Sequence, residues 1–95
     1  MTEKKVRAHA IISGKVQGVF FRMETQKAVR EIGDICGWVR NKSDGTVEAV
    51  FEGDENRVIR ALEWCKKGSP RASVRRVDVT WGDCTNASEG FDITW

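Results

Sequence analysis

The chain has 95 residues, of which 40% are hydrophobic and 32% are charged; this composition indicates one globular domain and excludes an intrinsically disordered chain. The net charge is only +2, and the sixteen basic residues are interleaved with fourteen acidic ones. The chain therefore has no block of basic residues that would indicate binding to nucleic acid. No segment approaches the roughly 20 apolar residues of a membrane span, and no apolar run of signal-peptide length opens the chain. We expect a single cytoplasmic domain over residues 1–95, with neither nucleic acid nor membrane as a partner.

A strand is predicted near the start, because apolar and polar side chains alternate from Val6 to Ser13. The next nine residues fit neither a strand nor the helix that follows; they read Gly14-Lys15-Val16-Gln17-Gly18-Val19-Phe20-Phe21-Arg22. We call residues 14–22 the glycine loop. Its two glycines permit positive φ, so successive backbone N–H groups can point into one concavity, which suits an anion.

Arg22 is the candidate anion-binding side chain of the glycine loop. Apolar residues at helical spacing up to Ile32, followed by Gly33, predict a helix over about residues 22–33. In its first turn the helix dipole opposes a cation by roughly 0.3 to 1 kcal/mol, so an arginine there suggests a functional role. Its planar guanidinium can bind two phosphate oxygens at once. The alternative is an ordinary strand-to-helix turn with a solvated arginine.

The middle of the chain predicts a β-hairpin. Residues from Ile35 to Asn41 are rich in β-formers, and residues from Thr46 to Glu52 alternate in polarity. The connection Lys42-Ser43-Asp44-Gly45 ends in Asp-Gly, the strongest short signal for a hairpin turn.

The second half predicts another helix and two further strands. Gly53-Asp54 caps the helix, and its buried stripe consists of Val58, Ala61, Leu62 and Cys65. Gly68-Ser69-Pro70 ends it. A fourth strand is expected over residues 76–81, a polar loop over 82–90, and a short final strand marked by Phe91, Ile93 and Trp95.

This order predicts an α+β fold of the ferredoxin-like, split βαβ type (βαββαβ): an antiparallel sheet with both helices on one face and a short fifth strand at the carboxyl end. Right-handed crossovers make the first two strands parallel, with the third strand between them. Their carboxyl ends then lie on one edge of the sheet, two strand spacings or roughly 10 Å apart. The glycine loop and Asn41 should therefore converge.

The converging residues favour phosphoryl transfer. The chain offers no paired carboxylates, Ser/His/Asp set or metal cluster at this edge, so acid–base and metal-assisted chemistries lack their usual residues. Phosphoryl transfer needs mainly positioning and positive charge, which oriented amides and Arg22 supply. The carboxamide oxygen of Asn41 can hold the attacking water. Because nothing nearby can protonate a poor leaving group, the substrate should carry a good one, such as a carboxylate.

Two segments resemble the signature motifs of the acylphosphatases. They are the glycine loop and Gly37-Trp38-Val39-Arg40-Asn41 with the following Asp44-Gly45-Thr46-Val47-Glu48, and the resemblance continues through Thr25 and Gly68-Ser69-Pro70. It implies a small cytosolic enzyme of ferredoxin-like fold that hydrolyses acyl phosphates to a carboxylate and inorganic phosphate. It also implies that no metal or cofactor takes part, and we expect a monomer.

The resemblance assigns roles to these residues. It implies that Arg22 and Asn41 are catalytic, with Arg22 binding the phosphoryl group and Asn41 orienting the nucleophilic water. A proton of that water is expected to pass to the phosphate of the substrate. The phosphate-binding loop is implied to consist of Gly14, Lys15, Val16, Gln17, Gly18, Val19, Phe20 and Phe21.

Two other functions are compatible with the same fold. An RNA-recognition domain needs exposed aromatic residues on the first and third strands, but the first has none, and Phe51 faces away from Glu48 and Glu52. A regulatory module could bind phosphate in the same cradle without hydrolysing a substrate. The side chains of Lys15, Gln17 and Arg40 could contact substrate or be solvated.

The cysteines and two of the tryptophans are predicted to be packing residues. Cys36, Cys65 and Cys84 are odd in number and widely spaced, so a zinc site is not expected and burial is favoured, with one disulfide left open. Trp38 and Trp64 are expected to pack in the fold and not to stack on a ligand.

Overall fold

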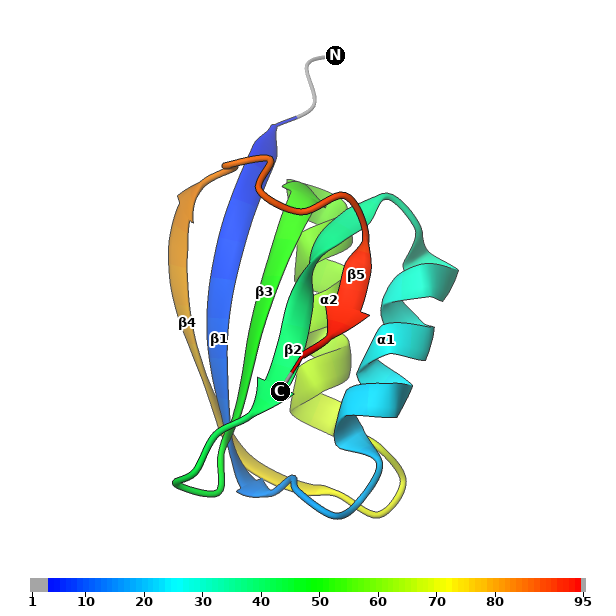
Figure 1. The fold of residues 1–95 in the computed structure, drawn as a ribbon, viewed down its shortest axis with the longest axis vertical. Helices are drawn as coiled ribbons and strands as arrows, with labels where there is room; N and C mark the ends of the chain where they lie inside the picture. The colour runs from blue at the N-terminus through cyan, green and yellow to red at the C-terminus, as the bar shows by residue number, and fades with distance from the viewer. Residues whose placement is uncertain (1–3, 95) are drawn as a thin grey trace.

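The computed structural model describes residues 4–94 and contains five strands and two helices (Figure 1). Their order and bounds are β1 (Lys5–Lys15), α1 (Phe21–Ile32), β2 (Ile35–Asn41), β3 (Val47–Asp54), α2 (Glu55–Lys67), β4 (Ser73–Asp83) and β5 (Phe91–Ile93). The predicted α+β, ferredoxin-like class is confirmed. Trp95, predicted to mark the last strand, lies outside the described residues.

The strands form one sheet in the order β4-β1-β3-β2-β5. Strand β3 is antiparallel to both β1 and β2, so β1 and β2 run parallel with β3 between them, as predicted. The fifth strand differs from the expectation of an antiparallel sheet: β5 pairs in parallel with β2, which makes the sheet mixed. The connection from β4 crosses the sheet to reach this far edge (Figure 1).

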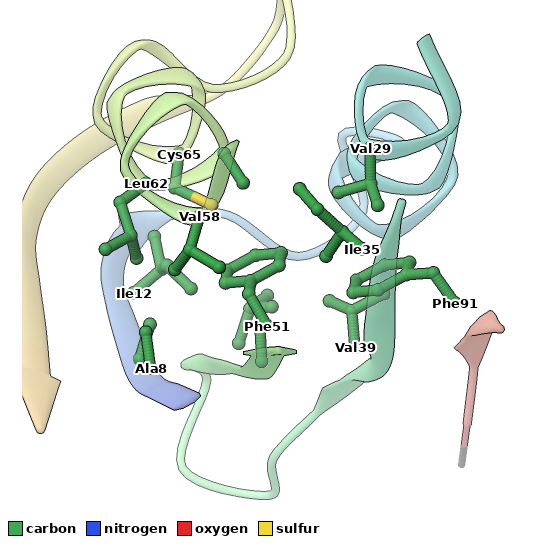
Figure 2. Packing of buried hydrophobic residues seen from close by; sticks show 14 of the residues in the cluster. Ala8, Ile12, Val29, Ile35, Val39, Phe51, Val58, Leu62, Cys65 and Phe91 are labelled. Atoms are coloured by element: carbon green, nitrogen blue, oxygen red, sulfur yellow. The ribbon is translucent and has the colours of Figure 1, made fainter. Parts of the chain in front are cut away.

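Both helices cover the same face of the sheet and enclose the core with it (Figure 1). Figure 2 shows Val58, Leu62 and Cys65 of α2 above Ala8 and Ile12 of β1. Burial raises the pKa of the Cys65 thiol to about 12, which suits a packing role. No helix within residues 4–94 is long and apolar enough to cross a membrane.

Gly37 allows two phenyl rings to meet across strand β2. It pairs with Phe51 of β3 on one side and with Phe91 of β5 on the other. The two rings stack with centroids 5.4 Å apart and planes 2° apart. A Cβ at Gly37 would lie 1.8 Å from the carbonyl oxygen of Val50, so no side chain fits there. The ring of Phe91 thus joins β5 to the core, and Figure 2 shows it with Phe51.

Three strands extend beyond their predicted ends, and the extension of β1 shortens the glycine loop. β3 continues through Gly53 to Asp54, so the predicted cap of α2 belongs to the strand, and Asp54 makes no side-chain capping hydrogen bond. β1 continues through Gly14 and Lys15, which pair with Val74 and Ser73 of β4 after a bulge. β4 itself spans Ser73–Asp83 instead of residues 76–81. The irregular part of the loop is therefore residues 16–20, because cross-strand pairing extends the regular structure beyond the alternating sequence pattern.

The cysteines only partly match their predicted burial. Cys65 is buried, whereas Cys36 and Cys84 are half-buried, and all three are free thiols. Cys36 shares the open face of the sheet with its cross-strand neighbour Glu52. The thiols of Cys36 and Cys84 are therefore not part of the core.

Two carboxylates on the open face are hydrogen-bonded, Glu52 being buried and Glu48 half-buried. Glu52 accepts hydrogen bonds from the backbone N–H and hydroxyl of Thr85 in the β4–β5 connection, which crosses above it. Glu48 accepts one hydrogen bond at 2.7 Å from His9 Nε2 and one at 2.6 Å from Arg40 Nε. Burial opposes ionisation of Glu48, but these two hydrogen bonds outweigh it and lower the pKa of the carboxyl.

The lowered pKa of Glu48 predicts a pH-dependent stability difference. The contribution of Glu48 is present above its ordinary pKa of 4.5 and is lost as the pH falls through the lower folded value. Glu48→Gln should therefore lower the free energy of unfolding near neutral pH. The loss should be only about 1 to 2 kcal/mol, because His9 and Arg40 are partly exposed and solvent weakens their interaction with the carboxylate. Denaturant unfolding should show this gap closing below about pH 4. Glu63→Gln, at an exposed position of α2, is the control and should show no such gap.

Candidate active site

The glycine loop and the carboxyl end of β2 meet at one pocket, as the predicted topology requires. The pocket has a volume of about 390 Å³, which is within the range of small-molecule sites. It is lined by Val16, Gly18, Phe20, Phe21, Arg22, Met23, Asn41 and Ile93. Six of the predicted site residues are therefore brought together, including both candidate catalytic side chains.

Arg22 lies in the first turn of α1, which begins at Phe21. The first N–H groups of a helix have no intrahelical acceptor, and the dipole places partial positive charge there. Phe20, the residue before the helix, has no side-chain acceptor and makes no capping hydrogen bond. The pocket thus combines backbone donors with a guanidinium, an arrangement that suits a phosphate-like anion.

Asn41 supplies an unused hydrogen-bond acceptor beside the pocket. It is the last residue of β2, and its Oδ1 is buried without a hydrogen-bond partner among residues 4–94. Buried polar atoms are nearly always paired, so an unpaired one points to a ligand or water as its partner. A carboxamide oxygen accepts hydrogen bonds, and a water molecule can donate one to it.

The short loop is held by the core beneath it. Val16 and Val19 are buried with 1% and 4% exposure, so their side chains anchor the backbone on either side of Gly18. The buried hydroxyl of Ser69 donates a hydrogen bond at 2.7 Å to the carbonyl of Val19. Gly18 has φ +72°, and a Cβ added there would meet nothing within 4 Å, so its backbone faces open space that a ligand can enter.

Gln17 links the loop to the β2–β3 hairpin. Its Nε2 donates hydrogen bonds at 2.7 Å to the carbonyl of Lys42 and at 2.9 Å to that of Thr46. Lys42 directly follows Asn41, so the side chain of Gln17 couples the position of the loop to that of the Asn41 carboxamide. Gln17 is half-buried and is not among the pocket-lining residues, and its two hydrogen bonds join the two halves of the site.

Removing the donor of Gln17 should impair turnover more than substrate binding. In Gln17→Glu the shape is kept, but a carboxylate replaces the amide and faces two carbonyl oxygens. We expect a loss of about 1 to 3 kcal/mol in the free energy of unfolding. For the acyl phosphate substrate that the sequence resemblance implies, we expect a larger fall in kcat than rise in KM. Gln26→Glu is the matched control, because Gln26 Nε2 donates instead to Phe91 of β5. An unchanged kcat in Gln17→Glu would contradict the alignment role.

The remaining predicted residues lie away from the pocket lining. Gly14 belongs to β1, and a Cβ added there would lie 2.2 Å from the carbonyl oxygen of Ser73. The glycine therefore allows β1 and β4 to pack closely. Lys15 is exposed at the end of β1. Arg40 pairs with Glu48 on the open face of the sheet and lies 5.7 Å from the ring centroid of Trp38. These side chains do not form the candidate site.

Sequence reasoning missed three residues of the site. Met23 follows Arg22 and is not one of the buried residues of α1. An apolar residue outside the buried stripe, next to a candidate site residue, was the only feature of the sequence that could have indicated it. Ile93 reaches the pocket because β5 pairs with β2 at Val39, which no local pattern indicates. Ser69 was noted only as part of a helix stop, and its contact with Val19 spans 50 residues of sequence.

Comparisons with known proteins identify the family of the chain. A sequence model of the family described as Acylphosphatase matches residues 8–93. The chain is 48% identical over 91 residues to an acylphosphatase of Pelotomaculum thermopropionicum, covering 96% of this chain and 98% of that protein. It is 52% identical over 93 residues to an acylphosphatase of Haloquadratum walsbyi, covering 98% of each.

A solved acylphosphatase structure has the same fold as this chain. The crystal structure of acylphosphatase from Bacillus subtilis matches with a TM-score of 0.90 and 34% identity, covering 95% of this chain and 99% of that one. Sequence and fold therefore agree over nearly the full length. The chain belongs to the acylphosphatase family of hydrolases.

Proposed function

We propose that the chain hydrolyses the carboxyl–phosphate bond of acyl phosphates, with Arg22 and Asn41 as its catalytic residues. One observation carries the proposal: Arg22, beside the amino end of α1, and Asn41, with its unpaired buried Oδ1, line the same pocket. A phosphoryl group and a water molecule are the partners that these two groups would select.

The phosphoryl group binds to Arg22 and to backbone N–H groups of residues 16–22. In the transition state, negative charge is spread over the three equatorial oxygens of the transferred group. A guanidinium and preorganised amides stabilise this charge at no cost of reorganisation, which is commonly the largest catalytic contribution. Val16, Val19 and Ser69 hold the loop in place for this purpose.

Asn41 accepts a hydrogen bond from the attacking water through Oδ1 and directs its oxygen at phosphorus. A new P–O bond forms as the bond from phosphorus to the carboxyl oxygen breaks. The electron pair of that bond leaves with the carboxylate, and a proton of the water passes to a phosphoryl oxygen. The products are a carboxylate and inorganic phosphate, so the balance requires neither an external base nor an oxidant.

The leaving group explains why no general acid is needed. A carboxylate leaves without protonation near neutral pH, because carboxyl pKa values lie near 4. A simple alkyl phosphate would instead release an alkoxide, and the pocket-lining residues offer no carboxyl, imidazole or thiol to protonate it. The proposed site is therefore suited to acyl phosphates and unsuited to alkyl phosphate esters.

The test measures loss of acetyl phosphate and release of inorganic phosphate by the purified chain, with and without EDTA. We expect equal amounts of both, unaffected by EDTA, and no release from glycerol phosphate above background. A phosphate-binding regulatory module would bind inorganic phosphate but leave acetyl phosphate intact. That outcome would refute hydrolysis. Cytoplasmic location and a monomeric state also stay predictions.

A further inference from the structure

The lining of the pocket includes apolar side chains that the phosphoryl chemistry does not use. Phe20 and Met23 are 60% and 57% exposed, the two highest values among the large hydrophobic residues described as exposed. Both line the pocket beside Arg22, and half-buried Ile93 of β5 lines it beside Asn41. We call Phe20, Met23 and Ile93 the acyl wall.

The backbone conformation at position 20 does not favour phenylalanine. Its φ of 60° and ψ of 24° are left-handed, a conformation that costs a non-glycine residue of this kind about 1 to 2 kcal/mol. Gly or Asn would adopt it with less strain, and Ser, Asp or Asn would cap the helix. The ring is neither buried nor a cap, so its presence needs another explanation.

The arrangement of the three side chains matches the shape of the proposed substrate. They come from the loop, the first turn of α1 and strand β5, so three separate segments each contribute an apolar side chain to the same pocket. An acyl phosphate carries its acyl group on the far side of the bridging oxygen from phosphorus. With the phosphoryl group at Arg22, the acyl group has the exposed side chains of Phe20 and Met23 available in the same pocket. The volume of about 390 Å³ is several times that of a phosphoryl group.

We propose that the acyl wall is a subsite for the acyl group and makes acyl phosphates with large apolar acyl groups better substrates than acetyl phosphate. This inference rests on the proposed hydrolysis. Apolar contact removes the acyl group from water, and each methylene covered raises kcat/KM by roughly two- to fourfold. The contacts are the same in the ground state and the transition state, so the effect falls mainly on KM.

The test compares acetyl, butyryl and hexanoyl phosphate as substrates of the wild type and of position-23 variants. For the wild type, we expect kcat/KM to rise along the series, with hexanoyl phosphate at least about tenfold better than acetyl phosphate. Met23→Gln keeps the length of the side chain but makes it polar, and should reduce this ratio by about threefold or more. Met23→Leu keeps an apolar side chain and should restore it.

Ile59→Ala is the matched control, because Ile59 is 40% exposed on α2 and does not line the pocket. Its ratio should equal that of the wild type. Equal kcat/KM along the series in the wild type, or an unchanged ratio in Met23→Gln, overturns the subsite and leaves hydrolysis standing. Absence of hydrolysis of all three substrates overturns the proposed function and the subsite together.

Discussion

Replacing Arg22 with Ala should lower kcat/KM for acetyl phosphate by about 10³-fold and weaken inhibition by inorganic phosphate at the same time. In the proposed mechanism the guanidinium binds the phosphoryl oxygens in the ground state and stabilises the added charge of the transition state, so binding and turnover should fall together. Arg22→Lys keeps the charge but not the bidentate geometry and should recover only part of the loss. Steady-state kinetics and phosphate inhibition constants measure both effects.

Stability separates this catalytic role from a structural one. The dipole of α1 opposes a cation in the first turn by roughly 0.3 to 1 kcal/mol, so Arg22→Ala should not lose stability in proportion to activity. Arg30→Ala is the matched control, because Arg30 is exposed in the last turn of the same helix. It should keep its activity. A large loss of folding stability with intact phosphate inhibition in Arg22→Ala would contradict the assignment.

Replacing Asn41 with Ala should abolish turnover while sparing phosphate binding. In the proposed mechanism the carboxamide holds the water and not the phosphoryl group. We therefore expect kcat to fall by about 10² to 10³-fold and the phosphate inhibition constant to stay within about twofold. The two variants therefore give different patterns of kcat and inhibition. Activity at the wild-type level in Asn41→Ala would refute the water-positioning role.

The unpaired Oδ1 predicts the effect of the same variant on stability. A buried acceptor without a partner costs about 1 to 3 kcal/mol, so removing it should leave the free energy of unfolding no lower than in the wild type. Asn56→Ala, at an exposed position of α2, controls for the loss of an asparagine and should change neither activity nor stability by much. A variant that is inactive yet as stable as the wild type is the result that catalytic function predicts.

Stability and catalysis make opposite demands on the start of α1. A helix start with Ser or Asp as its cap and an acidic first turn would be more stable than one with left-handed Phe20 followed by Arg22. In the proposed mechanism, the first N–H groups of α1 and the guanidinium of Arg22 instead bind the phosphoryl group. The core compensates for this, because Val16 and Val19 are buried on both sides of the exposed Gly18.

The sequence by itself determined the order of the elements and the meeting of the glycine loop with Asn41. Alternation in β1, the helical spacing before Gly33 and the Asp44-Gly45 turn are local signals, which depend on neighbours a few residues away. The handedness of the crossovers then makes β1 and β2 parallel, so the convergence follows without any knowledge of side-chain contacts.

Only the tertiary structure decided which loop residues face the pocket and what surrounds them. Pairing with β4 draws Gly14 into β1, and the parallel pairing of β5 brings Ile93 to the pocket. Gln17 reaches the hairpin across 25 and 29 residues of sequence. These contacts join segments distant in the chain, and the free energy of such pairing depends on packing that no local pattern encodes.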